Sequence, residues 1–313
     1  MKKMLRFFLL MTAVLLAAAL TASAVSAPVL GRVYSAGKNL LFSTDNVTLN
    51  GTADFMLDGV RFKGVKAKYM QDGYNSYWDY KLLTPRLEEA GDRETGYTIV
   101  ANEDYIYTID AFYPGSYREG YDNPPQNTLV RTSALMDQVV DLAGAAVGCM
   151  EPLLGGDAVQ VIADNHTGTT VHIVLNGENI TALTNAAFNM CAQMVIRRLI
   201  EPMDYDYIRS GYGGLYDYMT LTKGILALTH RYDLRGADVT ATIDGSGRLR
   251  AVSGSVKVEL TMDEGLVLAN ETQPHVIDLS FNVTASDYNS TRVSAFDPEA
   301  EGLKPQYVLY SEY

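Results

Sequence analysis

A glycine-rich loop with an aspartate at its head is the first place in this sequence where chemistry could reside. It lies in "ATIDGSGRLRAV", residues 241–252, and reads Asp244-Gly245-Ser246-Gly247. A phosphate-binding loop needs a helix after it, because the amino terminus of that helix supplies the dipole and the free amides that hold the anion. Here alternating residues flank the loop on both sides, and arginines stand where calcium would need further oxygen ligands. We therefore expect a plain hairpin turn.

Histidines and cysteines form no recognisable catalytic or metal-binding pattern. The four histidines, none at metal-ligand spacing from another, are His166, His172, His230 and His275. The sequence has no G-x-S-x-G elbow, no H-E-x-x-H motif and no Walker motif. Cys149 and Cys191 either pair or act as buried apolar thiols, and we favour buried thiols. We expect no enzymatic activity, no metal and no cofactor.

Two aromatic segments are the remaining candidates for ligand binding. Residues 201–219 mix aspartates with tyrosines, which can bind sugars or cations, although we favour a connection that covers the end of a sheet. Trp78, the only tryptophan, shares an alternating strand with Tyr80 and Leu82, whereas Tyr77 points the other way. We expect Trp78 in a strand interior rather than on an exposed sugar platform. An enzyme acting on polysaccharide through the 204–218 loop is disfavoured, because no acid/base pair is marked.

The strands that must position these residues follow from period-two alternation. It predicts hairpins around Asp58-Gly59 and Asp72-Gly73 and further strands between residues 239 and 285. The phase of the alternation slips at Gly64 and at Ser253-Gly254. A one-residue slip at a glycine predicts a β-bulge, which bends a sheet.

Two mostly apolar helices are predicted between the strand regions, over residues 133–150 and 180–200. Each has a narrow polar stripe, which in the second helix consists of Thr181, Asn185, Asn189, Gln193 and Arg197. Since a surface helix normally has a wide polar face, these helices should be largely enclosed. The expected fold class is α+β: a curved antiparallel β-sheet, or half-barrel, with two long apolar helices packed on its concave face.

The amino terminus predicts export from the cytoplasm. Three basic residues lie within the first six positions, an almost wholly apolar run extends from Leu5 to Ala22, and Ala22-Ser23-Ala24 fits a cleavage site. We favour cleavage over an uncleaved anchor, and in both cases the domain is extracytoplasmic, secreted or anchored to the cell membrane. Residues 1–27 are thus a signal peptide or N-terminal membrane anchor, and residues 28–313 a single domain.

The net charge limits the partners that the domain can have. It is −12 for the whole chain, and removal of the three cations that precede residue 28 makes it −15. An acidic protein of this kind is repelled by nucleic acid and by anionic lipid. We expect no nucleic-acid partner and membrane contact only through the N-terminal segment.

The pattern as a whole resembles the half-barrel of bacterial lipoprotein and lipid carriers, the LolA-like and LppX-like group. The strings that carry the resemblance are "ADVTATIDGSGRLRAVSGSVKVEL" and "HVIDLSFNVTASDYNSTRVSAFDP". Such carriers also place a strand, a turn and further long strands late in the chain, but this chain lacks the cysteine at which many of them are lipidated. The strings "LLFSTDNVTLNG" and "SGSVKVEL" are also similar to an uncharacterised family of secreted or membrane-anchored bacterial proteins.

The resemblance and the apolar helices together imply a non-catalytic extracytoplasmic protein with an apolar cleft between sheet and helices. The ligand expected there is a lipid or another apolar small molecule. The expected lining residues are Leu135, Val139, Leu142, Phe188, Met194 and Val195. Taken singly, each is better explained as ordinary core. The alternative is a tethered cell-envelope structural or regulatory domain with a filled core that binds another protein.

Overall fold

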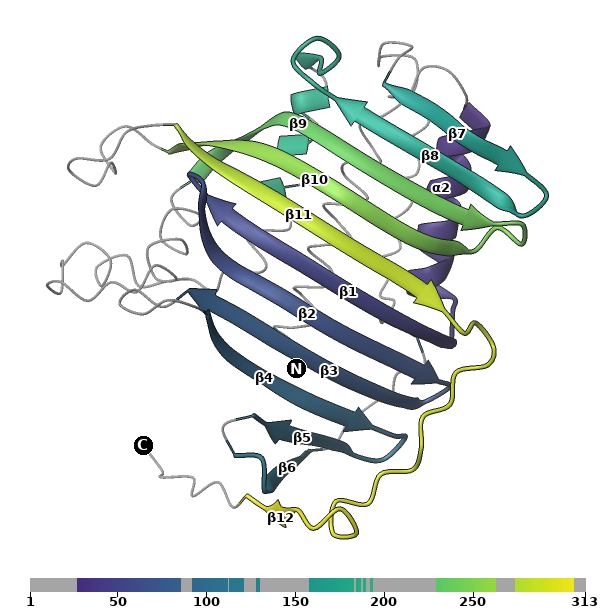
Figure 1. The fold of residues 1–313 in the computed structure, drawn as a ribbon, viewed down its shortest axis with the longest axis vertical. Coiled ribbons are helices and arrows are strands. Elements are labelled where there is room, and N and C mark those ends of the chain that lie inside the picture. The colour runs from purple at the N-terminus through teal and green to yellow at the C-terminus, as the bar shows by residue number, and fades with distance from the viewer. Residues whose placement is uncertain are drawn as a thin grey trace, which may run out of the picture. The chain divides into compact units, whose positions relative to one another are not determined.

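The protein is described here by a computed structural model. The residues that it describes are 27–85, 92–111, 113–120, 128–129, 158–182, 184–186, 188–189, 192–193, 229–262 and 274–306. They contain the helix α2 (Ala27–Phe42), a short helical stretch within 182–193, and a large sheet (Figure 1). The strands are β1 (Asn46–Leu57), β2 (Val60–Asp72), β3 (Asn75–Pro85), β4 (Asp92–Ala101), β5 (Ile106–Asp110), β6 (Ser116–Gly120), β7 (Val159–Asn165), β8 (Gly168–Leu175), β9 (Thr229–Asp244), β10 (Leu249–Met262), β11 (His275–Ser286) and β12 (Lys304–Pro305).

Hydrogen bonds join the strands in the order β12-β6-β5-β4-β3-β2-β1-β11-β10-β9-β8-β7. Neighbours from β2 to β6 and from β7 to β10 pair antiparallel, and β12 joins β6 in parallel. The chain divides into two compact units. The first comprises Met1–Lys38, Ala53–Lys63 and Thr132–Asn282, and the second Asn39–Thr52, Gly64–Arg131 and Val283–Tyr313.

The core of the first unit lies on one face of strands β7 to β10. Val171 and Ile173 of β8 are fully buried and face Ala241 and Val239 of β9, whereas His172 between them lies on the other face and is only partly buried. Figure 1 shows α2 along strands β7 to β10, and the helix buries Leu30, Val33 and Ala36 at helical spacing. The apolar face therefore forms the core of this unit.

The expected fold class is wrong in its helices. The sheet is large and antiparallel, as expected, but the described residues hold only short helical segments and no pair of long apolar helices. The predicted helix over 133–150 lies outside the described residues, and of the one over 180–200 only a stretch within 182–193 is described and helical. Both helices were predicted from their apolar content, which alone does not fix where a helix begins, ends or packs. The helix α2 was not predicted either: apart from Ala27 its residues were assigned to the domain, but no element was predicted before Val47.

The turns that join the strands agree with their sequence signals. Asp58 and Gly59 have φ angles of 51° and 80°, and Gly73 has 61°, values typical of tight hairpin turns. The glycine-rich loop that begins at Asp244 is a hairpin turn between β9 and β10, as predicted. Its aspartate, Asp244, accepts hydrogen bonds at 2.9 Å from the backbone amides of Ser246 and Arg248. The loop thus closes on its own carboxylate.

The bulge predicted at Ser253-Gly254 is absent from the pairing of β10 with β9, and relative to β11 it stays a prediction. The register of β9 and β10 shifts between Leu249 and Ala251 and between Lys257 and Val258, but it runs evenly through Gly254. Glycine is needed at this position because the backbone of β9 approaches so closely that a Cβ would overlap the carbonyl oxygen of Asp238. At Gly64 the pairing of β2 with β3 is regular, and a bulge relative to β1 stays a prediction.

Candidate functional site

The candidate site is one face of strands β2 to β5 in the second unit, here called the aromatic face. Its register places two rows of side chains across the strands. The first row is Ala67, Tyr80, Tyr97 and Asp110, and the second is Tyr69, Trp78, Ile99 and Thr108. Residues directly opposite each other on neighbouring strands share a face of the sheet, so the rows bring four aromatic rings together.

The rings of the aromatic face contact one another in pairs. The ring centroids of Tyr69 and Trp78 lie 4.0 Å apart with an interplanar angle of 53°, and those of Tyr80 and Tyr97 lie 5.5 Å apart at 30°. Such pairs contribute about 0.5–1.5 kcal/mol each beyond the area that they bury. Each pair therefore helps to fix the orientation of its rings.

Burial is uneven across the aromatic face. Tyr69 and Tyr80 are buried, with 3% and 6% of their surface exposed, and Ile99 is buried beside them. Trp78 and Tyr97, one from each ring pair, are only half-buried. Accessible aromatic surface thus remains next to a buried apolar layer, which is the arrangement that an apolar ligand needs.

Several polar groups near the aromatic rings are engaged within the protein. The Tyr69 hydroxyl donates to the fully buried Gln71, whose Nε2 donates to the carbonyl oxygen of Gly73 at 2.9 Å. On β5, in the same row as Tyr80 and Tyr97, the buried carboxylate of Asp110 lies 3.5 Å from the Arg118 guanidinium. A sugar site needs polar groups directed at the ligand, whereas these are directed at each other, so the face offers ring and aliphatic surface.

Burial also keeps the phenols neutral. It is the main reason why the pKa of Tyr69 lies far above its usual value, although a hydrogen bond with Ser76 opposes the shift. Burial likewise raises the pKa of Tyr80, and the nearby Tyr97 and Asp110 raise it further. Both hydroxyls therefore stay protonated through the physiological range, and the aromatic face gains no phenolate charge.

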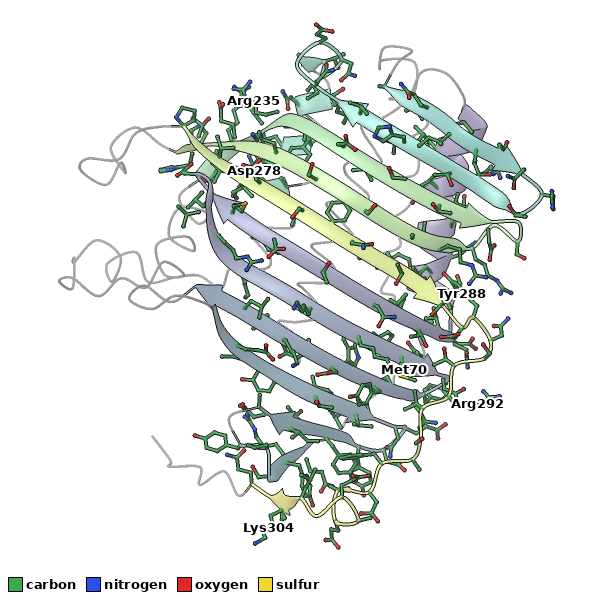
Figure 2. All side chains as sticks on the ribbon, viewed as in Figure 1. Met70, Arg235, Asp278, Tyr288, Arg292 and Lys304 are labelled. Atoms are coloured by element: carbon green, nitrogen blue, oxygen red, sulfur yellow. The ribbon has the colours of Figure 1, made fainter. Side chains whose placement is uncertain are left out.

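The opposite face of the same strands carries charged side chains. Lys66 and Lys68 are exposed on β2, and the Nζ atom of Lys81 lies 2.7 Å from the Glu94 carboxylate. Tyr77 lies on this face, as the sequence predicted, because it pairs with Met70 and Val100 rather than with the residues of the aromatic face. Figure 2 labels Met70 near the end of β2. This face thus combines charged side chains with a row of less polar ones, Met70, Tyr77, Val100 and Tyr107.

The expected lining residues are only partly located. Phe188 is buried in the first unit with 3% of its surface exposed, on the short helix within 182–193. The positions of Leu135, Val139, Leu142, Met194 and Val195 lie outside the described residues. So do Cys149, Cys191 and the tyrosine-rich loop over 201–219. Their roles stay predictions.

The aromatic face was not identified from the sequence, although its signal is present there. The turn at Asp72-Gly73 was recognised, and a two-residue turn fixes the register of the hairpin. Asp72 opposite Asn75 places Tyr69 opposite Trp78, three pairs further along the strands. The expectation that Trp78 lies in a strand with Tyr80 and Leu82 on one side is confirmed, and the missing step was to extend that face to Tyr69 and Tyr97.

Histidine and acidic residues form pairs rather than larger clusters. His172 Nε2 lies 2.9 Å from Asp238, and His275 Nδ1 lies 2.7 Å from Asp58, with the two pairs on different strands. Within the described part of the chain, no three His, Cys, Asp or Glu side chains are placed to hold a metal ion. Among the described helices, none is both long and apolar enough to cross a membrane.

Comparisons with known proteins found a similar solved structure. No protein-family model and no curated protein matches the chain. It is similar to the crystal structure of LprF from Mycobacterium bovis, over 88% of this chain and 99% of that chain. The TM-score is 0.32 and the sequence identity 10%. A likeness at this level assigns neither a ligand nor an activity to this chain.

Proposed function

We propose that this chain is a non-catalytic, extracytoplasmic protein that binds a lipid or another apolar ligand on its aromatic face. The observation that supports this proposal is the half-buried pair Trp78 and Tyr97 beside the buried Tyr69 and Tyr80. Because several polar groups around these rings bond to each other, the ligand is expected to contact the face through its apolar part. The basic and apolar N-terminal segment, expected to be a signal peptide or an anchor, supports the extracytoplasmic location.

The first test is native mass spectrometry of residues 28–313, purified gently from a bacterial host, before and after organic extraction. We expect an additional mass that extraction removes, and its identity would name the ligand. A clean apo mass, with no uptake of added fatty acid or phospholipid, would contradict the proposal.

The second test uses Trp78 as its own reporter, since it is the only tryptophan in the sequence. A brominated acyl chain quenches tryptophan fluorescence on contact, so a brominated fatty acid should quench Trp78 and its unbrominated counterpart should not. We expect Tyr97→Ala to weaken binding about tenfold, equivalent to the loss of about 1.4 kcal/mol of ring contact. Tyr77→Ala removes a tyrosine from the opposite face of the neighbouring strand and should leave the affinity unchanged.

A structural role is the second candidate, and the first unit favours it. The apolar residues Val171, Ile173 and Ile243 are fully buried there, as expected of a filled core. On this reading the chain is a tethered envelope domain that meets another protein. Absence of quenching together with a clean apo mass is the result that this candidate predicts.

A further inference from the structure

Three amide side chains of the short helix hydrogen-bond to the backbone of a strand. Asn185 Oδ1 accepts from the amide of Leu234 at 2.7 Å, and Asn189 Oδ1 accepts from the amide of Tyr232 at 2.8 Å. Gln193 Nε2 donates to the carbonyl oxygen of His230 at 2.6 Å. We call Asn185, Asn189 and Gln193 the amide ladder. They belong to the polar stripe that the sequence shows at every fourth position.

The ladder can follow β9 because every fourth position of the helix is spaced almost like every second residue of a strand. Four residues of an α-helix rise about 6.0 Å, and two residues of a strand rise about 6.8 Å. Successive side chains of the ladder therefore meet alternate residues of β9, in the order 234, 232 and 230. The helix runs antiparallel to the strand and presents its amides as a neighbouring strand would present its backbone.

Within the described residues, the ladder lies where a neighbouring strand would pair with this part of β9. β8 pairs with β9 only as far as Leu175 opposite Ala237, so residues 230–234 lie beyond its end. On its other side this part of β9 pairs with β10, with Leu234 opposite Val258 and Tyr232 opposite Leu260. The groups bonded to the ladder are those that point away from β10. A row of outward backbone groups is a template for another strand unless it is covered.

We propose that residues 230–234 of β9 form a strand-acceptor edge that the amide ladder keeps closed, and that β9 of a second copy of this chain occupies the edge when the ladder is removed. Two copies of one chain associate most often about a two-fold axis, on which the same patch serves both partners. Antiparallel pairing about Tyr232 places the outward residue His230 opposite Leu234 of the other copy.

Charge supports this register. In the same pairing Arg231 lies opposite Asp233 of the other copy, and opposite charges across neighbouring strands are favourable. Within one copy Arg231 Nε already donates to Asp233 Oδ1 at 3.0 Å, and the Arg231 side chain is more than half exposed. The Asp233 side chain, in contrast, keeps only 9% of its surface exposed, so the Arg231 guanidinium of the other copy can reach its carboxylate only when the edge is open.

The test removes the ladder with the double variant Asn185→Ala and Asn189→Ala. Alanine is a better helix former than asparagine, so the helix itself is not weakened by the change. Hydrogen exchange is measured at the Tyr232 and Leu234 amides, with the amides of residues 237–244, which lie between β8 and β10, as the internal reference. Sedimentation velocity over a concentration series measures self-association.

We expect the Tyr232 and Leu234 amides to exchange at least tenfold faster in the double variant at low concentration, and dimers to form as the concentration rises. Asn185→Asp with Asn189→Asp keeps both acceptor oxygens and should retain slow exchange and a monomer. Ala186→Asn, at an exposed position of the same helix, is the matched control and should behave like the parent.

Two results would overturn the proposal. Unchanged exchange at Tyr232 and Leu234 would show that the ladder does not close the edge. Faster exchange without any association would show that the open edge does not accept a second copy. The register is tested by adding Arg231→Glu to the double variant. In pairing about Tyr232 this substitution places a second carboxylate, at position 231 of one copy, opposite Asp233 of the other, so the dimer should weaken severalfold. An unchanged dimer would exclude pairing about Tyr232.

Discussion

Gly254 lies where two strands leave no room for a side chain. A Cβ there would overlap the carbonyl oxygen of Asp238 and crowd the backbone of Val239, neither of which can rotate away. We expect Gly254→Ala to lower the free energy of unfolding by about 1–3 kcal/mol, the usual cost of overpacking. Urea denaturation followed by circular dichroism measures this difference.

Gly177 provides the matched control for that substitution. Nothing lies within 4 Å of a Cβ built at Gly177, so Gly177→Ala should change stability by no more than about 0.5 kcal/mol. Equal effects of the two alanines would show that close approach of the strands is not what requires glycine at position 254.

Asp244 couples the β9–β10 turn to pH. Burial alone would raise the pKa of its carboxyl, but hydrogen bonds from the Arg248 and Ser246 amides and the charge of Arg250 outweigh it, so the pKa is lowered. A carboxyl with a lowered folded pKa stabilises the protein above its unfolded pKa, which is about 3.9, and this stabilisation is lost as the pH falls through the folded value.

We therefore expect Asp244→Asn to flatten the acid limb of a plot of unfolding free energy against pH below about pH 4. Asparagine keeps an oxygen for the two amides but loses the attraction to Arg250, whose guanidinium lies 2.8 Å from the carboxylate. Glu178→Gln, on an exposed turn, serves as the control and should leave the acid limb unchanged. A parallel shift of the whole Asp244→Asn curve, with no change of shape, would contradict the assignment.

At the scale of elements, α2 is part of the folded structure. Leu30 keeps only 2% of its surface exposed, and the Arg32 side chain bonds to Thr169 and Asp164 at the β7–β8 turn. We expect Leu30→Ala to cost about 2–5 kcal/mol of unfolding free energy, because it leaves a cavity in the core. Ser35→Ala, on the exposed side of the same helix, should cost less than about 0.5 kcal/mol.

Truncation offers a second measurement on α2. A chain that begins after Phe42 should melt well below one that begins at residue 28, because the apolar face of the first unit loses its cover. If both chains melt at the same temperature, α2 is not part of the core.

Strands and turns were predictable from the sequence because their signals are local. Asp58-Gly59 and Asp72-Gly73 define turns by themselves, and the alternation of Leu279, Phe281 and Ala285 with polar residues marks the buried side of β11. Helices were harder to predict, because their placement depends on what they cover. The stripe with Asn185 and Asn189 was recognised, but its partner, the edge of β9, is 43 or more residues away in the sequence and is defined only by where β8 ends.

The aromatic face shows the same limit for the candidate site. Tyr69, Trp78 and Tyr97 come from three strands, and each is an ordinary strand residue when its own segment is considered alone. Only the register of both hairpins puts them on one face. How accessible those rings are depends on burial, which the alternation of residues does not encode. For this reason Trp78 could be placed correctly in a strand without being assigned to a candidate site.

At the scale of the whole molecule, charge governs which surfaces the protein can approach. Residues 28–313 carry a net charge of −15, which follows from −12 for the chain and the three cations before residue 28. We expect this segment to remain unbound in a flotation assay with anionic vesicles at low salt, because like charges repel across about a Debye length. The full chain, if its apolar N-terminal run is retained, should float with anionic and zwitterionic vesicles alike, since insertion of that run does not depend on lipid charge.

The comparison separates the two ways in which the protein could meet a membrane. Flotation of residues 28–313 at low salt, lost at high salt, would contradict the prediction and indicate a local basic patch. Lys66 and Lys68, exposed on the face of β2 opposite the aromatic face, would then be the residues to invert to glutamate. Flotation of the full chain alone would instead show that contact is made through the N-terminal segment, which leaves the aromatic face available to a ligand while the domain is tethered.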